Sequence, residues 1–322
     1  MVHELPLRQV MDAIQLNPSN RLPVAECRHI WSKFGSFYRH CDSSRIQRFR
    51  CKLCGLNSSV ARNELFYRQR LRAINSLIFK QLVSGVSQRR CAIILHLNRK
   101  TVVRKFRVMG GYSVALLKLQ NQNSDPVKEM EFDDLETFEH TKCKPLSVTL
   151  AVEKKTRRIL GFEVSRMPAK GRLAAISIKK YGPRKDGRAK SRKKLFREIK
   201  SLVHPLAEIM SDDNPHYPPD IRTHFPLCSH ITIKGGRGAI TGQGELKRLK
   251  FDPIFSINHT FAKLRGDINR LFRKTWCTTK DPSQLRIHIA MMAIFHNHRL
   301  ADPKVTVPIF NIGGHLNHRY HF

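Results

Sequence analysis

The stretch Glu131-Phe132-Asp133-Asp134-Leu135 decides the fold that we expect for the larger part of the chain. It places two adjacent carboxylates inside a segment, 128–138, that reads as a β-strand. Two more strands are predicted directly after it, at 146–152 and 159–164. The chain therefore opens this region with three consecutive strands, the first of which carries acids in its middle.

Downstream, an amphipathic helix is predicted at 195–209, followed by a short apolar strand that ends in Ser211-Asp212-Asp213. Three strands, a helix and an acid-tipped strand follow the order of an RNase H-like α/β sheet, in which the first strand and the next parallel strand are neighbours. Asp133 and Asp212 are then expected side by side. Two carboxylates so close repel each other unless a divalent cation, Mg²⁺ or Mn²⁺, lies between them. Such a pair predicts two-metal chemistry at a phosphodiester, whereas Asp134 and Asp213 are expected to be surface acids or helix caps.

A third ligand is expected on a following helix, predicted from Asp252 through Trp276 with Pro253 at its start. Asn258 lies in its first turns, and its neutral carbonyl oxygen is an acceptable ligand for Mg²⁺ that lacks a charge. Glu245 is the alternative acid. Its Gly-rich surroundings, 235–238, suit phosphate contact better.

Composition supports a polyanionic partner. The 322 residues hold 59 Lys and Arg against 25 Asp and Glu, a formal charge of +34, while a hydrophobic fraction of 41% supports two or three folded domains. No run approaches about 18 apolar residues, so no membrane span is expected. No secretory signal is visible either. These features predict an intracellular, cytoplasmic protein that binds a polyanion.

Four of the eight cysteines fall between Cys27 and Cys54, which predicts a local metal site rather than a disulfide framework. Cys51-Lys52-Leu53-Cys54-Gly55 is a knuckle in which two thiolates chelate structural Zn²⁺ and glycine permits the turn. Cys27 is the natural third ligand. His29, His40 and Cys41 compete to be the fourth.

A helix-turn-helix is predicted next. Ser87 is expected to cap a first helix, which ends where the apolar Ile93, Ile94 and Leu97 pack against a core. Asn98 is expected to cap a second helix, 99–106. The second helix directs Val102, Val103 and Phe106 inward and its cations outward, as a recognition helix in a major groove requires. The residues expected to contact DNA in this module are Gln88, Arg89, Arg90, Asn98, Arg99, Lys100, Thr101, Arg104 and Lys105.

A basic segment, Lys179–Lys200, holds 11 Lys and Arg against two acids and is expected to be an arm that follows DNA through its phosphates. Two arginines on the predicted helix after Asn258 are candidates for the same contact. The expected phosphate contacts are Lys185, Arg188, Lys190, Arg192, Lys193, Lys194, Arg265 and Arg270.

The segments 84–90, 98–106, 132–138 and 273–276 resemble insertion-sequence transposases of the insertion-sequence-one-like group, in order and over about residues 27–300. The resemblance implies a DDE-type DNA transposase that binds terminal inverted repeats in double-stranded DNA, cuts at their ends and joins the 3′-OH to target DNA. Asp133 and Asp212 match the catalytic carboxylates, and Asn258 stands where many relatives have Glu. Since two DNA ends must be held together, a homodimer or higher oligomer is expected.

The expected organisation is α+β and multidomain. The predicted segments are a leader (1–26), a zinc-ribbon-like module (27–62), a helix-turn-helix region (63–120), a linker (121–127), an RNase H-like catalytic domain (128–300, with the basic insertion 179–200) and a tail (301–322). The alternative to a transposase is a catalytically inactive, transposase-derived DNA-binding repressor, which Asn258 and the incomplete ribbon support. An RNA nuclease of the same fold is disfavoured by the helix-turn-helix.

Overall fold

The computed structural model describes residues 27–40, 43–63, 66, 69–234, 252–272 and 275–301. The chain divides into two compact units, with the division between Lys80 and Gln81. None of the described helices is both long and apolar enough to cross a membrane.

The first unit contains a three-stranded antiparallel sheet with the order β1-β2-β3. The strands are β1 (Trp31–Arg39), β2 (Ser44–Cys51) and β3 (Asn57–Ser59), followed by the short 3₁₀ helices η2 (Val60–Asn63) and η3 (Arg72–Ile74). Helix α2 (Asn75–Leu82) spans the division between the units. The knuckle Cys51–Gly55 forms the turn between β2 and β3, and Gly55 adopts a φ of +71°, which explains why a glycine follows the second cysteine of the pair.

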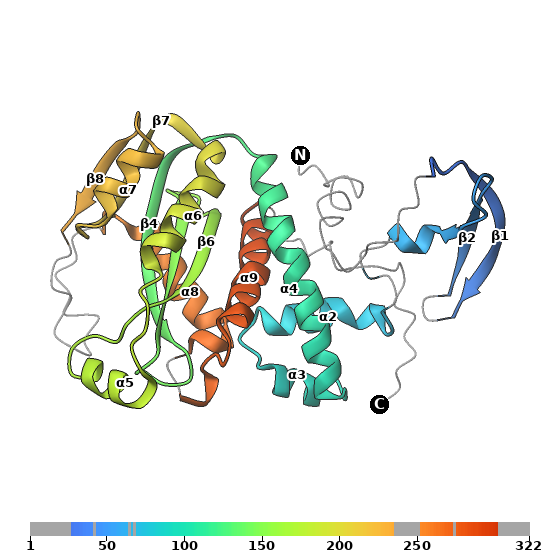
Figure 1. Cartoon of the computed structure of the whole chain (residues 1–322), viewed down its shortest axis with the longest axis horizontal. Helices are drawn as coiled ribbons and strands as arrows, with labels where there is room; N and C mark the ends of the chain where they lie inside the picture. The colour runs from blue at the N-terminus through green and yellow to red at the C-terminus, as the bar shows by residue number, and fades with distance from the viewer. Residues whose placement is uncertain are drawn as a thin grey trace. The chain divides into compact units, whose positions relative to one another are not determined.

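The second unit is built on a five-stranded mixed sheet with the order β6-β5-β4-β7-β8 (Figure 1). The first three strands in sequence form an antiparallel meander, and β7 then pairs in parallel with β4. The first strand and the acid-tipped strand are therefore parallel neighbours, as the sequence predicted. The strands are β4 (Val127–Phe138), β5 (Pro145–Glu153), β6 (Ile159–Arg166), β7 (Val203–Asp212) and β8 (Ser229–Ile233).

Helices cover both faces of this sheet. On one face, Met130 and Phe132 of β4 pack with Phe196 of α6 (Arg188–Ile199) and with Tyr217 of α7 (Tyr217–His224) in a fully buried core. Gly161 of β6 permits the close approach of α6, because a Cβ there would lie 2.8 Å from the Leu195 side chain. On the other face lies α8 (Phe255–Asp267), which contacts β4 and β5.

Two long helices, α4 (Arg99–Gln122) and α9 (Pro282–Ala301), run side by side against β6 (Figure 1). Gly110 makes their contact possible, since a Cβ at this position would lie 2.7 Å from Cβ of Ile287. The predicted helix-turn-helix consists of α3 (Gln88–Ile94) and the first turns of α4, and it therefore belongs to the same compact unit as the sheet. The remaining elements of this unit are α5 (Leu173–Tyr181), η4 (Lys200–Leu202), η6 (Asn269–Leu271) and η7 (Thr275–Cys277).

Two predicted helices have the wrong bounds. The helix expected at 195–209 is α6, which ends at Ile199, and Val203–Asp212 form β7 instead. Pro205 explains this difference, because proline disfavours helical conformation in the residue before it and removes a helical hydrogen bond. The helix expected to run through Trp276 ends at Asp267, where Ile268 takes an extended conformation.

Candidate active site and nucleic-acid interface

Asp133 and Asp212 lie at equivalent positions on neighbouring strands. The parallel ladder pairs Met130 with Ile209 and Glu131 with Met210, so two further steps bring Asp133 level with Asp212. Asp133 lies in the interior of β4, and Asp212 is the last residue of β7. The fold therefore brings together two carboxylates that are 79 residues apart in the sequence.

The local electrostatics disfavour two ionised carboxylates. Burial, with the nearby charges of Asp212 and Asp134, raises the pKa of Asp133 to about 7. Burial likewise raises the pKa of Asp212, with further contributions from Asp134 and Asp213. Desolvation and mutual repulsion thus disfavour the charged forms of both carboxyl groups. A divalent cation between them would favour the charged forms again.

The residues present fit such a cation. Oδ1 of Asp212 is buried and has no hydrogen-bond partner among the described residues. Oδ1 of Asp133 accepts hydrogen bonds from the backbone N–H of Asp134 (2.6 Å) and from the hydroxyl of Tyr217 (3.4 Å). The unpartnered oxygen of Asp212 and the carboxylate of Asp133, which these hydrogen bonds orient, provide the hard oxygen ligands that Mg²⁺ prefers.

Sequence reasoning underrated Asp134 and missed Tyr217. Asp134, expected to be a surface acid, is half-buried, accepts a hydrogen bond from the Thr149 hydroxyl and raises the pKa of Asp212. The adjacent pair Asp133-Asp134 was the only signal in the sequence for this role. Nothing in the sequence around Tyr217 pointed to the site.

Asn258 lies on the solvent side of α8, where its side-chain amide donates to Asp252 at 2.8 Å. Its neighbour Ile257 donates its backbone N–H to the buried carboxylate of Glu131 on β4, also at 2.8 Å. Glu131 is two residues before Asp133, which is about 6.6 Å along a strand. The alternative ligand, Glu245, and the Gly-rich segment 235–238 lie outside the described residues.

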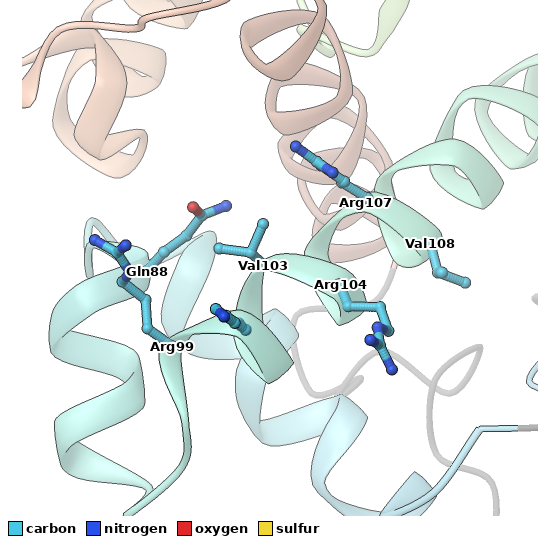
Figure 2. Close-up of a pocket in the computed structure, with 7 residues that line it drawn as sticks. Gln88, Arg99, Val103, Arg104, Arg107 and Val108 are labelled. Atoms are coloured by element: carbon cyan, nitrogen blue, oxygen red, sulfur yellow. The ribbon is translucent and has the colours of Figure 1, made fainter.

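The helix-turn-helix carries a basic groove of about 660 Å³ (Figure 2). The caps are as predicted: the Ser87 hydroxyl accepts from the N–H of Arg90, and the Asn98 side chain accepts from the N–H of Lys100. Figure 2 shows Val103 between Gln88 and Arg107. The residues that line the groove are Gln88, Arg99, Lys100, Val103, Arg104, Arg107 and Val108.

The orientation of several side chains in this module differs from the prediction. Lys105, expected to face outward, is buried, and Val103, expected to face inward, lines the groove. Ile93 and Ile94 do not end α3 against a core, because they are 67% and 52% exposed. The helical period of α4 accounts for the first two differences, since Lys105 and Phe106 share the buried side with Val102 and Met109. Arg89 and Arg90 are exposed and Thr101 is half-buried.

The predicted basic arm consists of the end of α5, a connection and α6, and α6 packs against β5 and β6 of the sheet. Arg192 is 4% exposed and bonded to Asp220 at 2.6 Å, which removes it from the expected DNA contacts. Lys194 pairs with Glu163, and Arg188 pairs with Asp186, both at 2.6 Å. Lys185, Lys190 and Lys193 are exposed and remain candidates.

The two arginines predicted after Asn258 occupy half-buried positions. The guanidinium of Arg270 lies 5.4 Å from the centre of the Phe106 ring, and burial lowers its pKa. Since Phe106 belongs to the core side of α4, Arg270 is held within the second unit, which does not suit a phosphate contact. Arg265 lies in the last turn of α8.

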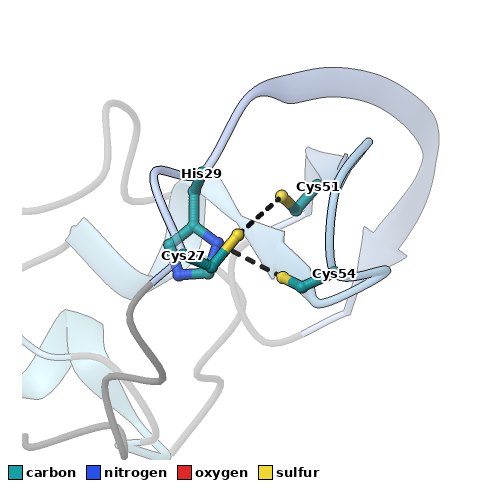
Figure 3. Close-up of side chains that lie close together, drawn as sticks. All are labelled: Cys27, His29, Cys51 and Cys54. Atoms are coloured by element: carbon teal, nitrogen blue, oxygen red, sulfur yellow. Dashed lines mark hydrogen bonds between the residues drawn. The ribbon is translucent and has the colours of Figure 1, made fainter.

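A second cluster that could hold a metal ion is formed by Cys27, His29, Cys51 and Cys54, whose ligand atoms all lie within 4.8 Å of one another (Figure 3). The Sγ atoms of Cys27 and Cys51 are 3.9 Å apart, and Sγ of Cys54 lies 3.3 Å from Nδ1 of His29. Three thiolates and one imidazole are a tetrahedral donor set for structural Zn²⁺. Of the three candidates for the fourth ligand, His29 occupies the position, His40 packs against Tyr38, and Cys41 lies outside the described residues.

The thiols of this cluster are electrostatically coupled. Burial opposes ionisation of Cys51, but hydrogen bonds from the backbone N–H groups of Cys54 and Leu53 and from His29 lower its pKa to about 6. Burial and the two neighbouring cysteines raise the pKa of Cys27 to about 11. Neighbouring thiolates repel each other, and a cation bound by the cluster would offset this repulsion. Metal binding by such sites is therefore coupled to their folding.

Comparison with known proteins gives limited information. The sequence matches no protein-family profile and no curated protein. Among solved structures, the chain is similar to the catalytic domain of Mos1 mariner transposase, with 14% identity and a TM-score of 0.21, over 62% of this chain and 93% of that domain. A likeness at this level carries no argument, so the fold rests on the strand order and the site on the placement of its carboxylates.

Proposed function

We propose that this chain is a DNA transposase of the DDE type, which cuts the ends of a mobile DNA element and joins them to target DNA with a divalent metal. The observation that carries the proposal is the pairing of Asp133 and Asp212 on adjacent parallel strands of a sheet with RNase H-like strand order. The orphaned Oδ1 of Asp212 supports it. The strand order alone would not support a transposase, because one fold serves many functions.

In this proposal Asp133 and Asp212 hold Mg²⁺ or Mn²⁺. Bound there, the metal would activate a water or 3′-OH nucleophile and stabilise the leaving oxygen of the phosphodiester. The protein's own contribution is to fix two carboxylates in position and to withdraw them from water, which strengthens their attraction for a cation.

Asn258 is the proposed third ligand. Its support is the anchoring of the adjacent residue, Ile257, to Glu131, two residues from Asp133 on the same strand. To act as a ligand, the exposed Asn258 side chain would have to give up its hydrogen bond to Asp252 and turn from the solvent side of α8 toward the sheet. A carbonyl ligand would supply oxygen without adding a third negative charge to a site in which two already repel.

The basic groove at the start of α4 is the proposed contact for the inverted repeats. Four cations, Arg99, Lys100, Arg104 and Arg107, line it together with the apolar Val103. Cations there would contact phosphates, while Gln88 and Val103 are of the kinds that contact base edges and thymine methyl groups. The exposed lysines of the 185–193 segment would contribute further phosphate contacts.

Cleavage of DNA that carries the inverted repeats flanking the coding sequence tests the proposal. With Mg²⁺ or Mn²⁺ the protein is expected to release 3′-OH ends and to transfer them to a second duplex. Asp133→Asn and Asp212→Asn should abolish both reactions, while Asp125→Asn, an exposed acid before β4, should retain them. Equal activity of all four proteins would refute the site.

A DNA-binding repressor without catalytic activity is the second candidate, and the engagement of Asn258 with Asp252 favours it. If the protein binds the repeats specifically but cleaves DNA with neither Mg²⁺ nor Mn²⁺, the repressor is favoured over the transposase.

A further inference from the structure

Tyr217 is the largest side chain buried beside the carboxylate pair. It is fully buried, and it is the first residue of α7, shortly after the acid-tipped strand β7. Its hydroxyl lies 3.4 Å from Oδ1 of Asp133. In this contact the phenol hydroxyl donates and the carboxylate oxygen accepts.

The ring of Tyr217 is fixed from two sides. Its centroid lies 4.8 Å from that of Phe132, the residue directly before Asp133 on β4. On another side the guanidinium of Arg192 lies 5.0 Å from the ring centroid, which is a cation–π distance. The phenol hydroxyl therefore has little freedom to leave Asp133.

Arg192 is in turn held by α7 itself. It is 4% exposed, and it donates to the carboxylate of Asp220 at 2.6 Å and to the backbone carbonyl of His216 at 3.3 Å. Asp220 lies one turn after Tyr217 on the same helix. These contacts connect α6, α7 and β4 in a continuous chain that ends at one oxygen of the site.

We infer that Tyr217 is a positioning residue that orients the Asp133 carboxylate for metal binding, with Arg192 and Asp220 fixing the tyrosine ring. The hydroxyl occupies one lone-pair direction of Oδ1, so it selects the rotamer of Asp133 and leaves the other oxygen, Oδ2, to face the cation. Outer-shell donors to ligating carboxylates act in this way in metal sites generally. This inference rests on the proposed function, since it needs Asp133 to be a ligand.

The test is the affinity of the full-length protein for Mn²⁺, measured by titration calorimetry without DNA. Tyr217→Phe removes only the hydroxyl and keeps the ring between Phe132 and Arg192. It is expected to weaken Mn²⁺ binding by about tenfold or more, as removal of outer-shell partners does. The matched control is Tyr181→Phe, which removes an exposed hydroxyl at the end of α5 and should bind Mn²⁺ as the wild type does.

The outcomes separate this inference from the proposed function. Loss of binding in Asp133→Asn, with normal affinity in Tyr217→Phe, would overturn the positioning role and leave the metal site intact. Absence of Mn²⁺ binding by the wild type would overturn both. Thermal unfolding of each variant is measured in parallel, because replacing a tyrosine with a purely structural role would lower the melting temperature without changing the Mn²⁺ affinity of the folded protein.

If Tyr217→Phe does not fold, Arg192→Lys is the second variant. It keeps the charge but loses the planar guanidinium over the ring, and it is expected to weaken Mn²⁺ binding. Unchanged affinity would contradict the inference.

Discussion

The buried carboxylate of Glu131 on β4 accepts the backbone N–H of Ile257 in the first turn of α8, at a distance of 2.8 Å. Glu131 is 1% exposed, and burial raises its pKa. Because helix N-terminal N–H groups have no partner within the helix, a carboxylate there satisfies donors and interacts favourably with the helix dipole. This contact joins the strand that carries Asp133 to the helix that carries Asn258.

Glu131→Ala should reduce the free energy of unfolding by about 1–3 kcal/mol, because it leaves a buried N–H without its acceptor. Glu131→Gln keeps a carbonyl oxygen at the same position and should lose less. Urea unfolding monitored by circular dichroism measures both. Equal losses in the two variants would show that the hydrogen bond to Ile257 is not what stabilises this junction.

The pKa of Asp133, about 7, sets a pH dependence for the metal-free protein. In the unfolded chain an aspartate titrates near 3.9, so between about pH 4 and pH 7 the folded state holds a proton that the unfolded state has lost. The contribution of Asp133 to stability therefore decreases as the pH rises through this range. Asp133→Asn lacks this dependence, so urea unfolding should show the variant becoming progressively more stable relative to the wild type from pH 4 to pH 7. Mn²⁺ affinity should rise over the same range, since the competing proton leaves.

Removal of zinc should unfold the first unit. Cys27, His29, Cys51 and Cys54 are expected to bind one Zn²⁺ per chain, measured by metal analysis, and a chelator should abolish the circular dichroism signal of the β1-β2-β3 sheet. His29→Ala should lose zinc more readily than the wild type. His40→Ala is the control, and zinc loss from this variant instead would reassign the fourth ligand.

Arg192 and Lys193 are adjacent cations whose removal is expected to change stability by very different amounts. Arg192→Ala removes the closer cation from the buried carboxylate of Asp220, leaving Lys193 at 3.9 Å, and should destabilise the protein by about 3–5 kcal/mol. Lys193 has a side chain that is 55% exposed, and Lys193→Ala should change stability by about 0.5 kcal/mol or less. Denaturant unfolding distinguishes the two. A comparable loss in both variants would argue against the buried pair.

Arg104 in the groove should contribute to DNA binding through a phosphate. Arg104→Ala is expected to weaken binding and to reduce the slope of log affinity against log salt by about 0.9. Lys118→Ala removes a charge from the far end of the same helix, where Lys118 pairs with Glu198, and should leave the slope unchanged. Fluorescence anisotropy at several salt concentrations provides the comparison, and identical slopes for Arg104→Ala and wild type would exclude a phosphate contact.

Local rules in the sequence determined the elements that depend on neighbouring residues. The three strands of the meander begin and end within two residues of their predicted positions, because alternation and turn residues are encoded within a few positions. The caps Ser87 and Asn98 and the knuckle Cys51–Gly55 were predictable for the same reason. The proximity of Asp133 and Asp212 followed from the order of the elements, since the next strand after a crossover pairs in parallel with the first.

Only the tertiary structure decided which polar side chains have partners. Arg192 lies among exposed lysines in sequence, yet it is buried because Asp220, 28 residues away, folds against it. His29 rather than His40 joins the cysteines because the segment before β1 returns to the knuckle. Tyr217 reaches Asp133 across 84 residues. Burial and pairing are properties of surfaces that meet in space, and the free energy of a charge or a hydroxyl depends on those partners more than on its sequence neighbours.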